Sequence, residues 1–234
     1  IVGFSLRGDG SSSFGPETPW FVSPSVSLRY NISDEKFFEP LRKTISMLGL
    51  RASWGITGSS SASTVSFYNT YTTSAGYYGT DPIITSSGMK IGDLVPQKKE
   101  GLNAGLNLGL FDDMIEADLN LYQETTRNLI MSGVPVPYST GSTTLAYGNI
   151  GKMQNKGWEL VIDGNRFIKR GKFSLSASFN IAQNTNKLLE MDQRVLDNLN
   201  SEYSATARGS SSILNRVVVD QPLCSIYGYE FKGV

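Results

Sequence analysis

The chain has 234 residues with 21 basic and 21 acidic side chains, a balance that argues against a nucleic-acid partner. It contains no histidine and a single cysteine, Cys224, which excludes histidine-based nucleophilic sites, internal disulfides and Cys-rich metal sites. No apolar run approaches the roughly 18 residues of a transmembrane helix. The opening Ile1-Val2-Gly3-Phe4 lacks the basic region of a signal peptide and begins inside a strand pattern. We therefore expect a piece of a longer protein.

Alternation of apolar and polar residues predicts about eight antiparallel β-strands. In chain order they lie near residues 2–6, 26–30, 48–56, 102–110, 115–131, 158–162, 173–181 and 226–232. The connector 31–46 is expected to hold a helical turn around Glu35–Phe38. The predicted class is therefore all-β.

The clearest hairpin is GLNAGLNLGLFDDMIEADLNLYQ, residues 101–123. Leu106 and Leu119 belong to one apolar face. The residues next to each of them along the strand point to the opposite face. That opposite face is polar, and we expect it to line a water-filled lumen. Its acidic and amide members include Asn107, Glu116, Asp118, Glu159 and Asp163.

The predicted connectors alternate in length. Long segments follow strands one, three, five and seven, tight turns follow strands four and six, and the connector after strand two is intermediate. Transmembrane barrels of the outer membrane have this asymmetry, with short periplasmic turns and longer extracellular loops. A soluble β-sandwich with polar outer faces remains the alternative.

Five stretches, in order, resemble the SusC/RagA family of TonB-dependent outer-membrane transporters. They are LRGDGSSSFG (6–15) followed by PSVS (24–27), LRASWGITG (50–58), the hairpin GLNLGLFDDMIEADLNLYQETTRNLIM (105–131), GNIGKMQNKGWEL (148–160), and QPL (221–223) with YGYEFKG (227–233). The GNIGKMQNKGWEL stretch is the most specific of them, and together they span nearly the whole chain.

The resemblance implies a barrel of about 22 strands with a plugged lumen, of which residues 1–234 form a middle part of one barrel domain. A plug domain, a TonB box and the barrel ends are not found in this chain. The resemblance also implies an outer-membrane location in a Gram-negative, Bacteroidota-like bacterium. Its implied partners are a SusD-like surface lipoprotein, TonB through parts outside this chain, membrane lipid, and an oligosaccharide or peptide cargo. We expect neither enzymatic activity nor a cofactor or metal.

Several tyrosines in the long connectors are candidates for binding cargo or the lipoprotein, because tyrosine is favoured at recognition surfaces. Packing within the loops or a place in an interfacial aromatic girdle is the competing explanation. Trp54 and Trp158 are expected to be girdle residues. The candidate tyrosines are Tyr68, Tyr71, Tyr77, Tyr78, Tyr138 and Tyr147.

Two further patterns have structural explanations that we prefer. Glu116 and Asp118 lie two residues apart on one strand face, a spacing that suits glycoside hydrolysis but also ordinary lumen lining. In the GNIGKMQNKG run, Gly151 and Gly157 are expected to adopt positive φ or to form a bulge.

The function expected is the wall and surface loops of a nutrient importer, with a carbohydrate-binding sandwich or a passive porin as alternatives.

Overall fold

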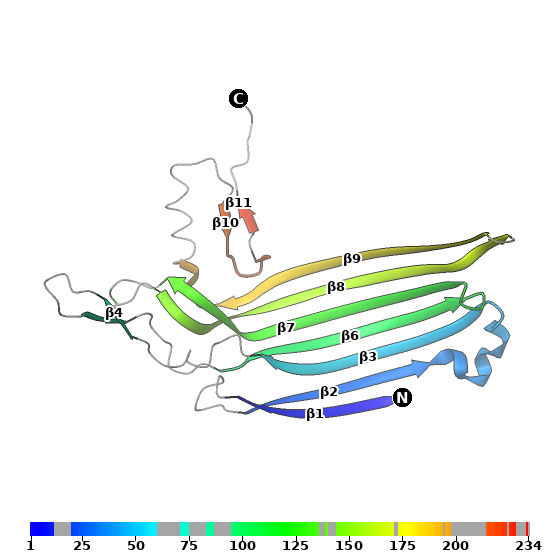
Figure 1. Cartoon of the computed structure of the whole chain (residues 1–234), viewed down its shortest axis with the longest axis horizontal. Coiled ribbons are helices and arrows are strands. Elements are labelled where there is room, and N and C mark those ends of the chain that lie inside the picture. Colours follow the sequence, from blue (N-terminus) through cyan, green and yellow to red (C-terminus); the bar gives the residue numbers. More distant parts are fainter. Residues whose placement is uncertain are drawn as a thin grey trace.

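The computed structural model describes residues 1–11, 20–59, 71–74, 83–86, 95–135, 139, 144–170, 173–193, 195–197, 214–223, 225–227 and 233. Its main feature is one seven-stranded sheet in the order β1-β2-β3-β6-β7-β8-β9 (Figure 1). Every neighbouring pair in this sheet is antiparallel. The strands are β1 (Val2–Gly10), β2 (Trp20–Asn31), β3 (Ile45–Ser59), β6 (Gln97–Leu110), β7 (Ile115–Pro135), β8 (Thr144–Arg170) and β9 (Phe173–Met191).

The connections sort onto two ends of the sheet (Figure 1). The end that we call the turn end holds the β6–β7 turn, the β8–β9 hairpin and the 3-10 helices η2 (Ile32–Asp34) and η3 (Lys36–Leu41). The opposite, loop end receives the connections β1–β2, β3–β6 and β7–β8. The β3–β6 connection contains a separate small sheet of β4 (Tyr71–Ser74) and β5 (Ile83–Ser86). The two tight turns thus lie at one end, as predicted, and the helical turn near Glu35–Phe38 is confirmed. The alternation of connector lengths is only partial, because the β2–β3 connector (32–44) at the turn end is longer than the β1–β2 (11–19) and β7–β8 (136–143) connectors at the loop end.

Two strand predictions need correction. Of the expected eighth strand, 226–232, the structure describes Ser225–Tyr227 (β11), which pairs with β10 (Leu214–Arg216) outside the main sheet; residues 228–232 lie outside the described residues. The main sheet in the described part of the chain therefore has seven strands. Strand β8 begins at Thr144, well before Trp158, because the glycine- and asparagine-rich run before Trp158 pairs with β7 on one side and with β9 on the other. Weak local β propensity in that run is overridden by pairing with two neighbours.

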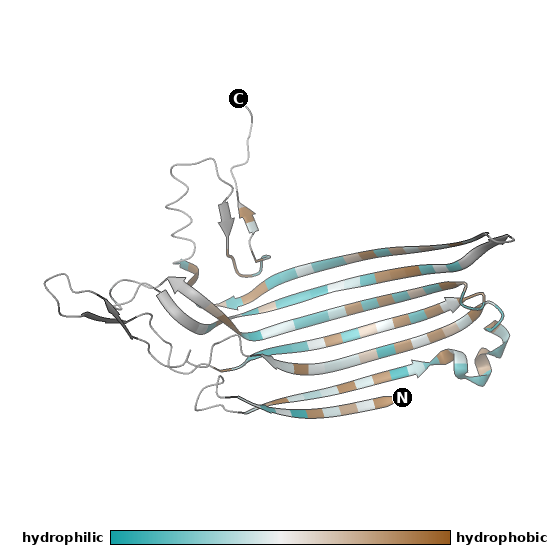
Figure 2. Cartoon of the chain, in the orientation of Figure 1, coloured by the Kyte–Doolittle hydropathy of each residue, from teal (hydrophilic) through white to brown (hydrophobic). Residues whose placement is uncertain are grey.

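The register assembles the alternating residues of separate strands into two continuous faces. Leu50, Leu106, Leu119 and Leu160 are directly paired across four adjacent strands. The row extends to Tyr30 on β2 and Ile181 on β9. Because paired residues point the same way and neighbours along a strand point opposite ways, one face is apolar and the other polar. The alternation of hydropathy along each strand is visible in Figure 2.

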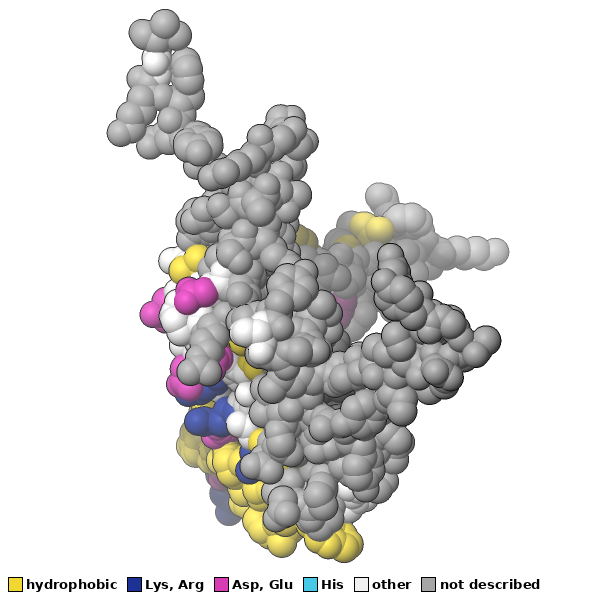
Figure 3. Space-filling model, turned by 90° about the vertical axis from the view of Figure 1, so that its left-hand side faces the viewer, with side chains coloured by type: hydrophobic (Ala, Val, Ile, Leu, Met, Phe, Trp, Pro, Cys, Tyr) yellow, Lys and Arg dark blue, Asp and Glu magenta, His cyan; other side chains and the backbone are white. Residues whose placement is uncertain are grey.

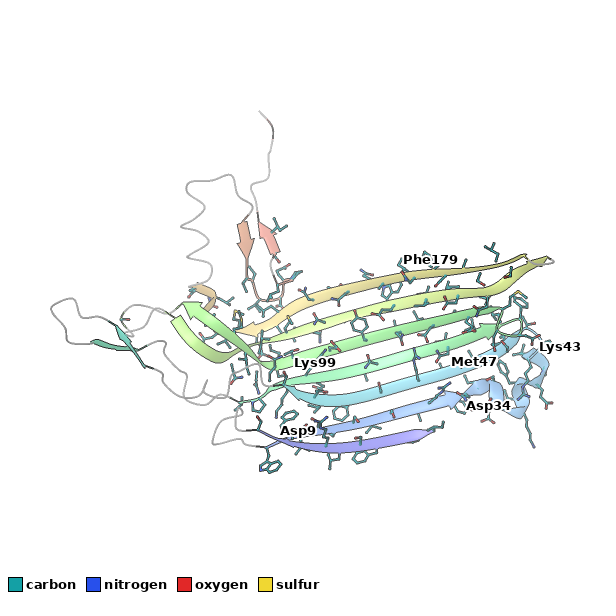
Figure 4. All side chains as sticks on the ribbon, in the orientation of Figure 1. Asp9, Asp34, Lys43, Met47, Lys99 and Phe179 are labelled. Atoms are coloured by element: carbon teal, nitrogen blue, oxygen red, sulfur yellow. The ribbon has the colours of Figure 1, made fainter. Side chains whose placement is uncertain are left out.

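No second layer covers the apolar face within the described part of the chain. Phe4 is 72% exposed and Phe179, labelled on edge strand β9 in Figure 4, is 56% exposed. The buried hydrophobic residues lie elsewhere: Phe21, Phe38, Ile150, Leu188, Val195 and Leu196. A soluble sandwich buries its sheet faces against each other, so this uncovered face favours a sheet whose apolar side meets lipid. Among the described residues, no helix is long and apolar enough to cross a membrane.

The apolar face has the height of a membrane interior. On β6 its apolar side chains run from Leu102 to Leu110, roughly 27 Å along the strand at about 3.4 Å per residue. At a strand tilt of about 40° this length corresponds to a height of about 21 Å. Outer-membrane barrels carry an apolar band about 25 Å tall. On β2 the band extends out to Trp20, whereas on β9 it ends at Ile181, so it crosses the hydrogen-bonded rows diagonally. A diagonal band is what strands tilted to the membrane normal require.

The β6–β7 turn has an unusual backbone. Phe111, Asp112 and Asp113 have φ of 55°, 56° and 59°, three consecutive residues in the left-handed region. The turn is supported from β3 and its preceding connector: the Asp113 amide donates to Ser46 Oγ at 3.1 Å, and the Phe111 amide donates to the Thr44 carbonyl at 2.9 Å. These bonds offset the cost of the left-handed backbone.

Of the two expectations for Gly151 and Gly157, positive φ or a bulge, positive φ does not occur, because both lie in ordinary extended backbone. A bulge lies beside Gly151: Leu129 pairs with Gly151 and Ile130 with Asn149, which leaves Ile150 as the extra residue on β8. What Gly157 provides is room: a Cβ there would lie 2.7 Å from the hydroxyl of Tyr122, whose ring covers the glycine from β7.

We expect substitution of Leu160 by arginine to destabilise the full-length protein far more than substitution of its neighbour Val161. Leu160→Arg places a charge on the apolar face, where a mid-membrane arginine costs about 2–4 kcal/mol. Val161→Arg, the matched control, places the same charge on the polar face opposite Asp118. Denaturant unfolding in lipid vesicles measures both free energies. Equal costs would contradict the assignment of the apolar face to lipid.

Candidate functional site

The polar face carries a connected side-chain network centred on the carboxylate of Asp118 on β7. Arg51 of β3 donates to its Oδ1 at 2.5 Å and Asn120 donates to the same oxygen at 2.8 Å. Asn107 of β6 donates to Oδ2, and Arg51 also donates to the Asn120 Oδ1 at 2.6 Å. Both carboxylate oxygens therefore have partners, supplied by three strands of the wall.

Gly105 on β6 makes this network sterically possible. It lies between Arg51 and Asn120 in the register, and the position of a Cβ there is occupied by the Arg51 side chain, with Asn120 Oδ1 at 2.9 Å. A groove of about 460 Å³ adjoins it, with Arg29, Arg51, Asn103, Tyr122 and Glu159 among its lining residues. The polar face is thus a hollowed surface with fixed charges, suited to contact a polar partner or a solvated cargo.

The five residues predicted to face the lumen all lie on this face. Asn107 and Asp118 contact each other directly, as described above. Glu159 is paired opposite Asn120, and Glu116 is paired opposite Asp163 nearer the turn end. Glu116 accepts a hydrogen bond from Asn165 at 3.1 Å. The partners Arg51 and Asn120 were not among the candidate site residues, and only the strand register reveals that they meet Asp118.

The hydrolase interpretation of Glu116 and Asp118 gains no support from this geometry. A nucleophile or general base needs a carboxylate oxygen that is accessible to substrate. Asp118 instead accepts bonds from Arg51, Asn107 and Asn120. These three donors make it a structural carboxylate that ties β3, β6 and β7 together.

The tyrosine candidates are not placed by the structure. Tyr68, Tyr77, Tyr78 and Tyr138 lie outside the described residues. Tyr71 and Tyr147 lie on β4 and β8, where the backbone is described but the side chains are not. A role for these tyrosines in binding stays a prediction.

Trp54 and Trp158 mark the loop-end border of the apolar face. Each indole lies on that face and donates through Nε1 to a polar residue: Trp54 to Glu100 at 3.1 Å and Trp158 to Gln183 at 3.0 Å. Beyond them the outward positions become polar, for example Thr125 and Gln154, which are also paired. An amphipathic ring between an apolar band and a polar zone is the arrangement of a membrane-interface girdle.

Comparison with known proteins agrees with this architecture. The chain matches the family profile described as "TonB dependent receptor-like, beta-barrel" over residues 1–211. It belongs to this family, whose members are β-barrels of the Gram-negative outer membrane.

Two curated relatives carry related names. The TonB-dependent receptor P39 of Formosa agariphila is 32% identical over 194 residues, covering 82% of this chain and 18% of that protein. The TonB-dependent receptor SusC of Bacteroides thetaiotaomicron is 29% identical over 194 residues, covering 80% and 19% respectively. The chain therefore spans about a fifth of the length of these relatives. Both are named as receptors.

Solved structures show the same fold. The RagAB peptide transporter matches with a TM-score of 0.74 at 28% identity, covering 82% of this chain and 21% of that one. The RagAB peptide importer in its "open-open" state matches with a TM-score of 0.71 at 27% identity, covering 82% and 20%. The resemblance to the SusC/RagA family is thereby confirmed.

We predict measurable coupling between Arg51 and Asp118 in a double-mutant cycle of Arg51→Gln and Asp118→Asn. The two side chains are 40% and 32% exposed, which limits the coupling to roughly 0.5–1 kcal/mol. Lys99 and Glu124, an ion pair at 2.7 Å on the same face, form the control cycle with Lys99→Gln and Glu124→Gln. The control should show weaker coupling. Asn107 and Asn120 already hold the Asp118 side chain in place, so forming its ion pair with Arg51 costs less side-chain entropy. Equal coupling in unfolding measurements would mean that the network adds nothing.

Proposed function

We propose that this chain forms part of the wall of a TonB-dependent importer in the outer membrane of a Bacteroidota-like bacterium. The observation that carries the proposal is the two-faced sheet, with an uncovered apolar face on one side and a hollowed polar face on the other. A barrel wall needs these two faces together, because one side meets hydrocarbon and the other a wet lumen. Family membership supplies the link to TonB.

The full protein is larger than this sheet in our proposal. Strands β1 and β9 are each paired with one neighbour in the main sheet, so each has an edge available for a further strand. On β9 the exception is Leu188, whose backbone bonds to Asp220 and Gln221. Unpaired backbone groups in hydrocarbon cost several kcal/mol each. Other strands of one polypeptide therefore close the barrel, in which residues 1–234 belong to a single domain of about 22 strands. A plug and the TonB-contacting segment lie outside these residues.

The proposed cargo is an oligosaccharide or a peptide, imported without chemical change. The polar face supports either cargo, because amide, hydroxyl and charged groups around Arg51 and Tyr122 bond equally to sugars and to peptide backbones. The peptide class has support from a similar solved structure, the RagAB peptide transporter. The oligosaccharide class rests on the resemblance to the SusC/RagA family. A SusD-like lipoprotein at the loop end is the proposed partner, and an enzymatic role is not proposed.

Deletion of the full gene in its host tests the transport proposal. The deletion strain should lose growth on one class of polymer, glycan or peptide, and regain it with the intact gene. Removing TonB function should have the same effect, whereas a passive porin would work without it. Unchanged growth on every glycan and peptide source would overturn the proposal, and TonB-independent uptake would favour the porin.

We predict that the turn end faces the periplasm and the loop end faces the cell surface. A protease site inserted between Asp112 and Asp113 should be cleaved only after cells are permeabilised. The same site inserted within residues 60–70, between β3 and β4, should be cleaved on intact cells. The reverse pattern would contradict the proposed orientation.

A further inference from the structure

At the loop-end border of the apolar face, basic side chains outnumber acidic ones. We define the outer rim as the outward-facing positions of β6–β9 beyond Trp54 and Trp158. The rim holds five basic residues and only two acidic ones. The basic residues are Lys98, Arg127, Lys152, Lys156 and Lys187; the acidic residues are Glu100 and Glu190. Figure 3, which looks onto the loop end, shows basic and acidic side chains gathered along one flank above hydrophobic ones.

The rim contains a groove immediately beyond the apolar band. Its volume is about 330 Å³, within the range of about 300–1,000 Å³ typical of small-molecule sites. Trp54 and Leu102 form its border with the apolar band, and Arg127 and Lys152 bring two cations to it. One carboxylate, that of Glu100, also lines the groove. A ligand in this groove would therefore touch apolar and cationic groups at once.

The acidic residues do not neutralise the rim. Arg127 reaches Glu100 at 3.4 Å, and Lys152 reaches Glu190 at 3.1 Å, but Glu190 is 72% exposed. Lys187 pairs at 2.9 Å with Asp220, which lies outside β6–β9 and is 68% exposed. Exposed pairs of this kind contribute little. Lys156 makes no ion pair with any described residue, so the rim keeps a positive excess.

The other borders of the wall also carry charge. At the turn end, the connector between β2 and β3 has three basic and three acidic residues, and the β6–β7 turn adds Asp112 and Asp113. The β8–β9 hairpin at that end carries Arg166, Lys169, Arg170 and Lys172 in its sequence, so the turn end is not free of positive charge. On the polar face at the level of the rim, Lys99 is paired with Glu124 at 2.7 Å. At the loop end, the positive excess therefore lies on the apolar side of the wall.

We propose that the outer rim binds the phosphate-bearing headgroup of a glycolipid in the outer leaflet. This inference rests on the proposed function, which puts the loop end at the cell surface. Acyl chains lie along the apolar band below Trp54, while phosphate oxygens accept charge-assisted bonds from Arg127 and Lys152. Sugar hydroxyls of the headgroup meet the side chains of Gln123, Thr125 and Gln154 in the same groove. Basic residues attract anionic lipid surfaces only within about a Debye length. The rim lies next to the apolar band, so its basic residues are within that distance of the headgroups.

Native mass spectrometry of the purified full-length receptor tests this site, with phosphorylated lipid A and its dephosphorylated form as the two probes. Arg127→Gln and Lys152→Gln should each lower retention of the phosphorylated lipid about fivefold, and the double variant about thirtyfold, since each cation near an anionic surface contributes about 1 kcal/mol. Lys99→Gln, the matched control at the same level on the polar face (labelled in Figure 4), should retain lipid like the parent. Inorganic phosphate at millimolar concentration should compete only weakly, because it lacks the acyl chains.

Three results would overturn the inference: equal retention of the two lipids, unchanged retention in the double variant, or full displacement by inorganic phosphate. Resistance to unfolding by heat in detergent shows that each variant is folded. The result is separable from the transport proposal. A receptor that imports its cargo but retains no phosphorylated lipid removes the rim inference alone, whereas one that retains lipid but imports nothing removes the transport proposal alone.

Discussion

Backbone hydrogen bonding between antiparallel strands is the constraint on which the rest of this structure depends. In hydrocarbon, an unpaired amide or carbonyl costs several kcal/mol, so neighbouring strands must pair along the full apolar span. Pairing sets the register, and the register sets which side chains form a row. The row from Tyr30 to Ile181 is apolar on six strands only because every pair is aligned. A slip of one residue in any strand would turn its leucines to the wet side.

The same registration places charge by depth and by side. On the polar face, Arg51 and Asp118 come from strands that are not neighbours, with β6 between them, and Gly105 leaves the space through which they meet. On the apolar side at the loop end, charged residues occur beyond Trp54 and Trp158, where our proposal places the lipid headgroups. Strand pairing therefore decides where charges can lie in this wall. A strand can carry a charged side chain only at a depth and on a side where that side chain stays solvated.

A wall built in this way separates stability from recognition. The apolar band and the strand ladder provide the stability, while in our proposal the polar face, the loops and the rim contact cargo, partner and lipid. The carboxylate of Asp118 illustrates the contribution to stability, because its bonds to Arg51, Asn107 and Asn120 fasten strands together. Binding of cargo, in our proposal, depends on groups that lie farther out, at the loop end.

The alternation of side chains determined the strands, the two faces and the sorting of connectors, because a period of two is a local property that needs no partner. It also placed Asn107, Glu116, Asp118, Glu159 and Asp163 on one face. Tertiary structure alone decided that β8 begins at Thr144 and that Ser225–Tyr227 leaves the wall to pair with β10. Both depend on which strand is available as a neighbour. The meeting of Arg51 with Asp118 was likewise hidden, because register across two ladders joins residues 67 positions apart, and no local pattern records that alignment.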